Sequence, residues 1–314
     1  MSSRKKTISI GVICFNEALN ISPAYQSLND IALINPKYNY EFIFVDNGSK
    51  DNTREEIRKI TQKDKKVVGV FLSRNFGPEA SSQAALDYAT GDAYVFYEGD
   101  MQDPPDIILD FIRQWEKGFD VVVGIRTKIE DNFFMAIIRK SYYKVFKAIS
   151  NIEVPVNAGS FGLIDKKVMD AIRQIPEKYR FFRGLRAWVG FKTAYVYYHR
   201  RKRQRGKSSY NFLGYLHHAE RSFFGFSYLP LDVMVYTGFF IVFVSFLTGI
   251  AYFLSQIILI QPINQTILII FSVIFFGGIQ LLALSIIGKY IQVIVEETKN
   301  RPVYIVEEVI KNKS

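Results

Sequence analysis

The sequence predicts an α/β fold with a mainly parallel sheet, and two observations carry this prediction. Short apolar runs rich in β-branched residues alternate with helical stretches over the first 125 residues, which favours parallel strands with helices on both faces of the sheet. From Val233 to Gly288 the chain contains no Asp, Glu, Lys or Arg, whereas charged and apolar residues mix before about residue 230. The 314 residues therefore divide into an α/β part and an apolar C-terminal part.

Five predicted strands follow one another along the α/β part. We expect them at residues 7–14, 40–45, 67–72, 93–97 and 121–124. One helical stretch extends to about residue 30, a second begins near residue 52 after a turn that can cap it, and a third covers residues 79–89. The apolar content of residues 7–14 also indicates that the N-terminus starts a strand and is not a signal peptide.

Polar side chains gather where these strands end. They are Asn16, Glu17, Asp46, Arg74, Asn75, Glu98, Asp100 and Arg126. In open parallel sheets, ligands bind outside the carboxyl ends of the strands. The coincidence of these positions predicts a binding site at that edge of the sheet.

The composition narrows the classes of function. The net charge of +10 indicates an anionic partner, such as nucleic acid, a membrane surface or a phosphate-bearing substrate. The single cysteine excludes a disulfide framework and a multi-cysteine metal site, and three histidines disfavour a His-rich zinc site. Among these partners, nucleic acid is disfavoured, because the basic residues concentrate beside the apolar part of the chain.

Two apolar stretches, residues 233–254 and 266–287, each reach the roughly 20 residues that cross a bilayer. Cationic residues precede the first (200–207) and follow the second, so the positive-inside rule places both flanking regions in the cytoplasm. We therefore expect an integral membrane protein with a cytoplasmic α/β domain (1–208), an interfacial amphipathic helix (209–230), a two-helix transmembrane hairpin (231–290) and a cytoplasmic tail (291–314). The alternatives are buried core helices for the hairpin and a helix packed on the domain's own surface for 209–230.

The segment Glu98-Gly99-Asp100 follows a strand directly and continues to Gln102. Carboxylates at a strand end can hold a divalent ion on a diphosphate, and their hard oxygen atoms favour Mg²⁺ or Mn²⁺. Taken alone, such a triplet is more often a solvated turn. Likewise, Asp46 alone would be an ordinary helix cap and Arg74 a surface arginine.

Several motifs together resemble the family 2 glycosyltransferases of the dolichol-phosphate mannose synthase and bactoprenol glucosyltransferase type, over nearly the whole chain. They are Ile13-Cys14-Phe15-Asn16-Glu17, Val45-Asp46-Asn47-Gly48-Ser49-Lys50-Asp51, Leu72-Ser73-Arg74-Asn75-Phe76-Gly77, Glu98-Gly99-Asp100-Met101-Gln102-Asp103-Pro104-Pro105, Arg203-Gln204-Arg205-Gly206-Lys207-Ser208, Gly288-Lys289-Tyr290 and Arg301-Pro302-Val303-Tyr304.

The resemblance implies a GT-A nucleotide-sugar domain that transfers a hexose-type sugar, with inversion, from a UDP- or GDP-sugar to a polyprenyl phosphate at the cytoplasmic membrane face. It implies that the donor contacts Phe15, Glu17, Asp46, Arg74 and Glu98, that the metal ligands are Asp100, Gln102 and Glu98, and that the catalytic residues are Asp100, Arg126 and Arg203. The expected partners are the donor, the polyprenyl acceptor and membrane lipid, with no nucleic acid; pairing of the apolar spans into a homo-oligomer stays open.

Some positions depart from the family pattern. Glu98 occupies the first Asp position of the family's Asp-x-Asp triplet. Asn47 occupies the second Asp position of its Asp-Asp-Gly-Ser motif, and Ser209 follows Ser208 where the motif has a Lys. Residues 157–162 read Asn-Ala-Gly-Ser-Phe-Gly, where bactoprenol relatives commonly read Asp-Thr-Gly-Asp-Phe-Arg. A phosphate acceptor with a second pKa of about 6 is already largely anionic at neutral pH and needs positioning more than proton removal. A transferase acting on a carbohydrate hydroxyl and a non-catalytic membrane scaffold remain the alternatives.

Overall fold

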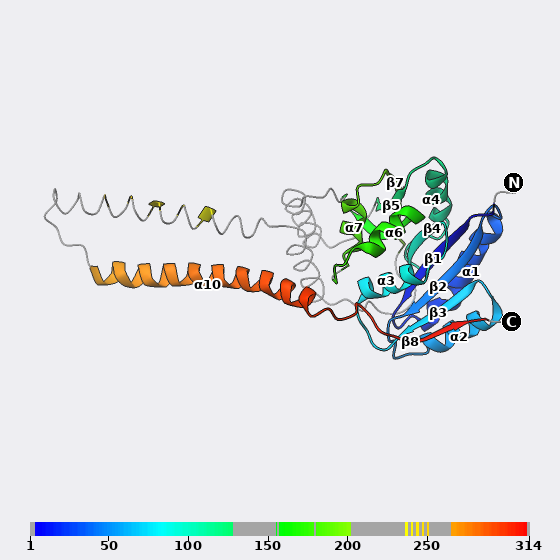
Figure 1. The fold of residues 1–314 in the computed structure, drawn as a ribbon, viewed down its shortest axis with the longest axis horizontal. Coiled ribbons are helices and arrows are strands. Elements are labelled where there is room, and N and C mark those ends of the chain that lie inside the picture. Colours follow the sequence, from blue (N-terminus) through cyan, green and yellow to red (C-terminus); the bar gives the residue numbers. More distant parts are fainter. Residues whose placement is uncertain are drawn as a thin grey trace. The chain divides into compact units, whose positions relative to one another are not determined.

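The computed structural model describes residues 4–127, 155, 157–178, 180–201 and 265–312, together with a few positions between 236 and 250. Within these residues, eight strands form one sheet in the order β7-β5-β6-β4-β1-β2-β3-β8 (Figure 1). The strands are β1 (Thr7–Cys14), β2 (Asn39–Asp46), β3 (Val67–Leu72), β4 (Ala93–Glu98), β5 (Val121–Arg126), β6 (Ala158–Asp165), β7 (Thr193–Tyr198) and β8 (Val306–Lys311).

Most neighbouring strands are parallel, as predicted. The pairs β1–β2, β1–β4, β2–β3 and β5–β7 are parallel, whereas β6 runs antiparallel to β4 and β5, and β8 runs antiparallel to β3. The five strands predicted from the sequence correspond to β1 through β5. Their carboxyl ends lie at one edge of the sheet, because parallel strands share a direction.

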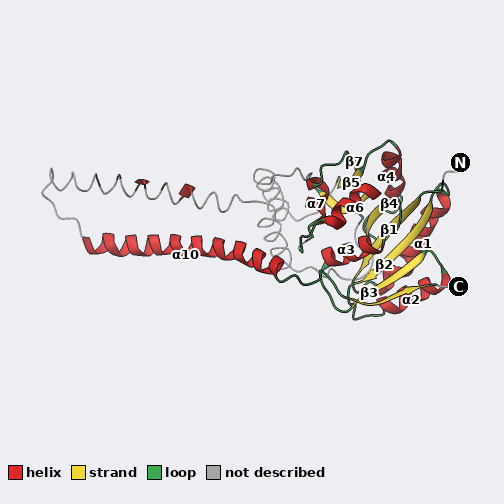
Figure 2. Cartoon of the chain, in the orientation of Figure 1, coloured by secondary structure: helices red, strands yellow, loops and turns green. Residues whose placement is uncertain are grey.

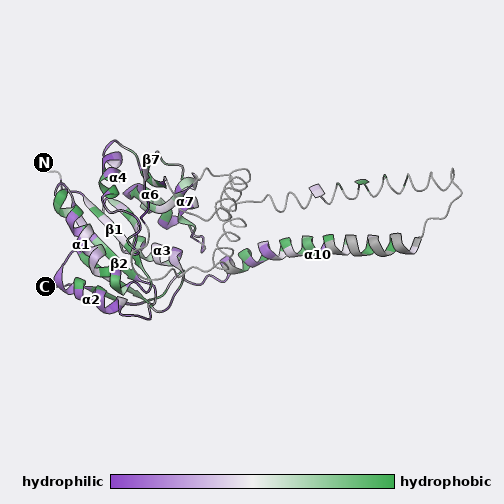
Figure 3. Cartoon of the chain, turned by 180° about the vertical axis from the view of Figure 1, so that it is seen from behind, coloured by the Kyte–Doolittle hydropathy of each residue, from purple (hydrophilic) through white to green (hydrophobic). Residues whose placement is uncertain are grey.

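Helices connect the strands and cover the sheet (Figure 2). They are α1 (Ala18–Ile34), α2 (Thr53–Lys63), α3 (Pro78–Tyr88), α4 (Ile107–Glu116), α6 (Lys166–Gln174) and α7 (Phe182–Trp188). In α2 the buried residues Ile57 and Ile60 lie on one side and charged residues on the other, so this helix packs one stripe on the sheet. Figure 3 shows the hydrophilic outer residues of α2.

The two faces of the sheet are buried separately. Residues such as Ile10, Phe44 and Tyr97 form one cluster with apolar residues of α1, α2 and α4. Strand residues of the opposite parity pack on the other side, where Phe96 meets Phe182 of α7 with ring centroids 5.1 Å apart. The alternation of side chains along a strand gives each face its own apolar layer.

The chain forms two units. The sheet belongs to the first, which comprises Met1–Lys147, Ile152–Gly214 and Asn300–Ser314. The second comprises Ala148–Asn151 and Tyr215–Lys299 and contains the 34-residue helix α10 (Gln265–Thr298). The predicted interfacial helix at 209–230 and most of the predicted span at 233–254 lie outside the described residues.

The prediction of an integral membrane protein with two spans is contradicted. None of the helices in the described part of the chain has both the length and the apolarity that crossing a bilayer requires. The prediction depended on the composition of two stretches, and apolar composition alone does not distinguish a spanning helix from other helices.

Candidate active site

The turn after β4 brings its carboxylates to the carboxyl edge of the sheet. The backbone N–H of Gly99 donates to Ile13 O at 2.9 Å, so the turn lies against the end of β1. A Cβ atom at Gly99 would lie 2.9 Å from both Ile13 O and the Sγ atom of Cys14, so a side chain does not fit there. Met101 adopts a left-handed backbone with φ of 59°. The close approach at Gly99 fixes where Glu98 and Asp100 lie.

Arg200, two residues beyond the end of β7, lies among the carboxylates of this turn. Its Nη2 atom is 2.9 Å from Glu98 Oε2 and 3.4 Å from Asp100 Oδ2, and its Nε atom is 3.3 Å from Asp103 Oδ1. Burial, and next the charge of Glu98, raises the pKa of Asp100 to about 7, although Arg200 opposes the shift. One guanidinium therefore neutralises part of a concentrated negative charge.

Asp103 lies deeper and has further partners. Its side chain is fully buried, and Tyr198 donates its hydroxyl to Asp103 Oδ1 at 2.7 Å. The Nη2 atom of Arg126 lies 3.8 Å from Asp103 Oδ2, and its Nε donates to the Tyr198 hydroxyl at 3.3 Å. Burial acts to lower the pKa of Arg126, but the charges of Asp103 and Glu98 outweigh it and raise this pKa. Arg126 therefore stays a cation beside the acidic turn.

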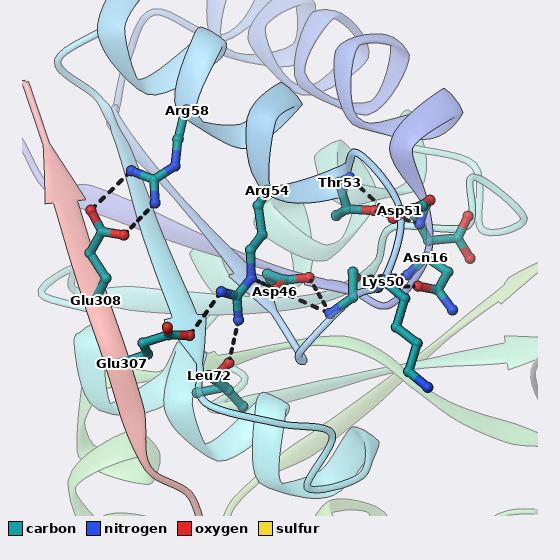
Figure 4. Close-up of polar contacts among 12 residues, drawn as sticks. Asn16, Asp46, Lys50, Asp51, Thr53, Arg54, Arg58, Leu72, Glu307 and Glu308 are labelled. Carbon is teal, nitrogen blue, oxygen red and sulfur yellow. Dashed lines mark hydrogen bonds and ion pairs between the residues drawn. The ribbon is translucent and has the colours of Figure 1, made fainter.

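A second polar group forms at the end of β2 (Figure 4). Asp46 is buried, and both of its oxygens accept from the backbone N–H of Ser49, at 3.1 and 3.3 Å. Arg54 of α2 donates from Nε to Asp46 Oδ2 at 2.8 Å, from Nη2 to Leu72 O at 2.7 Å and from Nη1 to Glu307 of β8 at 2.8 Å. Arg54 therefore joins the ends of β2 and β3 to the C-terminal strand.

The loop after β1 is attached to the same region. The backbone N–H of Asn16 donates to Ser49 Oγ at 2.8 Å, and its side-chain oxygen accepts from the N–H of Lys50 at 2.8 Å. The N–H of Glu17 donates to Thr53 Oγ1 at 2.9 Å, and its buried carboxylate accepts from Asn20 at 2.6 Å. These bonds place Glu17, and with it the half-buried Phe15, beside the end of β2.

Arg74 lies on the neighbouring loop after β3. Its guanidinium carbon is 4.0 Å from the ring centroid of Phe76. Asn47 attaches this loop to the end of β2, because its side chain accepts from the N–H of Phe76 at 2.9 Å and donates to Asn75 at 3.1 Å. Gly48 is required here, since a Cβ atom would lie 2.5 Å from the Arg74 carbonyl carbon.

The structure thus places the predicted site residues at one edge of the sheet, in two groups. Glu98, Asp100 and Arg126 lie around the turn after β4, where Gln102 donates its backbone N–H to Asp100 Oδ1 at 3.1 Å. Phe15, Glu17, Asp46 and Arg74 lie at the ends of β1, β2 and β3. Arg203 lies outside the described residues.

Four residues of these groups were not among the predicted site residues. Arg200 belongs to the basic run 200–207, and Asp103 belongs to the motif after β4. The sequence shows both residues but not that they form an ion pair. Their pairing joins positions about 100 residues apart, which spacing in one sequence does not reveal. Tyr198 and Arg54 carry no sequence signal beyond a strand end and a helix start.

The segment with the altered motif packs against two arginines. A Cβ atom at Gly159 would lie 2.9 Å from Arg126 Nη2, and one at Gly162 would lie 2.7 Å from Arg186 Nη1. Arg186, which is buried on α7, donates to Gly159 O at 2.7 Å and to Ser160 O at 3.0 Å. Small residues in this segment therefore make room for guanidinium groups.

Comparisons with known proteins agree with these observations. The model of the Glycosyl transferase family 2 matches residues 9–173. A bactoprenol glucosyl transferase of Shigella phage SfII is 34% identical over 301 residues, 96% of this chain and 97% of that protein.

Two further relatives are uncharacterized glycosyltransferases. The one from Synechocystis sp. is 35% identical over 302 residues, covering 96% of this chain and 95% of that protein. YkcC of Bacillus subtilis is 36% identical over 306 residues, covering 97% of this chain and 94% of that protein. The predicted transferase activity and GT-A-like fold with a mostly parallel sheet are confirmed, and the chain belongs to glycosyl transferase family 2.

Proposed function

We propose that the protein transfers a sugar from a nucleotide-sugar to the phosphate of a polyprenyl phosphate. The observation that carries the proposal is the convergence of Glu98 and Asp100 with Arg126 and Arg200 at the carboxyl edge of the sheet. Carboxylates suit a cation on the donor diphosphate, and guanidinium groups suit phosphate oxygens. The near-full-length similarity to a bactoprenol glucosyl transferase supports a polyprenyl acceptor.

The donor would lie along the ends of β1, β2 and β4. Phe15, Glu17 and Asp46 would line the nucleoside end, with Arg74 on the adjacent loop. The diphosphate would then lie at the turn after β4. We assign UDP- or GDP-sugars as the donor class, because the site offers both buried acidic acceptors for a base and a cationic side for phosphates.

Glu98 and Asp100 fit a divalent ion, because their oxygens already converge on one cationic nitrogen of Arg200. Within the described ranges no third acidic, His or Cys side chain completes a protein-only metal site. Two carboxylates plus donor phosphates are the usual ligands of Mg²⁺, and Gln102 could add an oxygen. When bound, Mg²⁺ or Mn²⁺ would neutralise the negative charge of the departing nucleoside diphosphate.

The chain's own residues would position the acceptor. Arg126, and Arg203 by resemblance, would neutralise the acceptor phosphate, whose oxygen forms a bond to the anomeric carbon as the bond to the diphosphate breaks. The electron pair of the broken bond leaves with the nucleoside diphosphate, and a single displacement inverts the anomeric centre. An ionised phosphate needs no base to remove a proton, which is compatible with Asn157 and Ser160 where relatives commonly carry carboxylates.

The test is transfer of radiolabelled sugar to undecaprenyl phosphate in detergent, with a panel of UDP- and GDP-sugars. Asp100→Ala should lower the rate by roughly a hundredfold or more, since it removes a charge that balances the leaving group. Asp110→Ala is the matched control, because Asp110 lies on α4, its side chain is 43% exposed, and its carboxylate pairs with Arg113 of the same helix. Full activity in Asp100→Ala, or label that stays in water-soluble product with every donor, would contradict the proposal.

A further inference from the structure

Arg200 takes the position of a cation between the carboxylates at the end of β4. A single atom, Nη2, is 2.9 Å from Glu98 Oε2 and 3.4 Å from Asp100 Oδ2. A bound Mg²⁺ lies about 2.0–2.1 Å from its oxygen ligands, and larger divalent ions lie only a few tenths of an ångström further away. An ion held by both oxygens would therefore overlap the space that Nη2 fills.

The two cations would also repel each other. At a few ångströms, like charges interact unfavourably even where water screens them, and Arg200 is about one-quarter exposed. We propose that Arg200 is an internal counter-ion of Glu98 and Asp100, which the divalent ion of the donor complex displaces. This inference depends on the metal role given to Asp100 in the proposed function.

The surroundings of Arg200 allow it to leave. Its Nε atom makes no hydrogen bond within the described structure, although it lies 3.3 Å from Asp103. Asp103 keeps two other partners when Arg200 moves, the Tyr198 hydroxyl at 2.7 Å and Arg126 at 3.8 Å. Glu98 and Asp100 would lose their contacts with Nη2, and these are the two carboxylates that an incoming ion would satisfy.

Arg200 therefore weakens binding of the metal alone. In the absence of donor, the ion has to break the contacts of Nη2 before it binds. The donor diphosphate changes this balance, because its phosphate oxygens are themselves acceptors for a displaced guanidinium. The arrangement favours joint arrival of the ion and the nucleotide-sugar over loading of the ion by itself.

The experiment titrates Mn²⁺ into the full-length, chelator-stripped protein without donor and follows free Mn²⁺ by electron paramagnetic resonance. Arg200→Gln should bind Mn²⁺ roughly tenfold to a hundredfold more tightly than wild type, the equivalent of one charge-assisted hydrogen bond. Arg201→Gln is the matched control: it removes the same charge one residue along, and its guanidinium pairs with Asp106 at 3.6 Å. Its affinity should stay within about threefold of wild type, because screening weakens the effect of an exposed charge.

Equal Mn²⁺ affinity in wild type and Arg200→Gln, or the same tightening in Arg201→Gln, would overturn the proposal. Asp100→Asn distinguishes a wrong role for Arg200 from a wrong metal assignment. If Asp100→Asn leaves Mn²⁺ affinity unchanged in both the wild-type and the Arg200→Gln protein, Asp100 is not a metal ligand. Should Arg200→Gln not fold, Arg200→Lys replaces it. The shorter lysine side chain does not reach the position of Nη2 between Glu98 and Asp100, so Mn²⁺ should again bind more tightly than to wild type, and unchanged affinity would refute the inference.

Discussion

Arg54 is predicted to be the counter-ion that lets Asp46 remain buried, and Arg58 provides a matched comparison. Both arginines lie on α2, one turn apart, and both stand over the ring of Phe71, at 5.7 and 4.9 Å from its centroid. Each pairs with a glutamate of β8. Only Arg54 also reaches the buried carboxylate of Asp46.

This difference determines how much free energy of unfolding each substitution should cost. Replacing one partner of a buried ion pair costs about 3–5 kcal/mol, because the other charge stays buried and unpaired. The side chain of Arg54 is 25% exposed, whereas that of Asp46 is 0% exposed, so water would screen part of the loss. We expect Arg54→Met to lower the free energy of unfolding by about 2–4 kcal/mol. Arg58→Met should cost only a small fraction of this, since both partners in its ion pair meet solvent.

Urea unfolding of the two variants, with the slope compared to wild type, measures the difference. In the double variant Arg54→Met/Asp46→Asn, most of the loss should be recovered, because a neutral amide needs no counter-ion. The Michaelis constant for the donor should rise in Arg54→Met and not in Arg58→Met, if Asp46 lines the nucleoside end. Equal destabilisation by the two single variants, or no recovery in the double variant, would refute this account of Asp46.

Two further predictions concern the other face of the sheet. In Gly162→Ala the new Cβ atom would lie 2.4 Å from Val122 O, so the free energy of unfolding should fall by about 1–3 kcal/mol; an unchanged urea midpoint would show that the strand can shift. Burial raises the pKa of Glu79 from its ordinary 4.5 to about 7, although the nearby charge of Arg183 opposes this shift. The folded state therefore holds a proton that the unfolded state releases, so this contribution to stability is full below about pH 4.5 and is lost as the pH rises to about 7. Glu79→Gln should flatten that slope, and a thermal-unfolding series from pH 4 to 8 that stays parallel to wild type would argue against it.

The central strands could be predicted because their own residues specify them. The predicted ranges 40–45 and 93–97 extend by one or two residues to Asn39–Asp46 and Ala93–Glu98. No strand was predicted at the positions of β6, β7 or β8. β6 contains Gly159 and Gly162, which weaken a strand pattern, and β8 alternates half-buried and exposed residues that gain stability only by pairing with β3.

The candidate site was predictable in its acidic and loop residues but not in its ion pairs. Asp46, Glu98 and Asp100 could be placed because each directly follows or ends a strand. Arg200 and Arg54 could not, because each acts across the fold on a carboxylate from another element. Such a contact depends on the three-dimensional path of the chain and on side-chain length, and neither is visible in local spacing.

The C-terminal strand has a consequence for biosynthesis. The first unit takes its edge strand from residues 306–311, after the chain has passed through the whole second unit. During translation, one edge of β3 stays unpaired until residues 306–311 emerge from the ribosome. An unpaired strand edge can pair with other nascent chains. A premature stop codon before residue 306 would therefore be expected to yield aggregated protein.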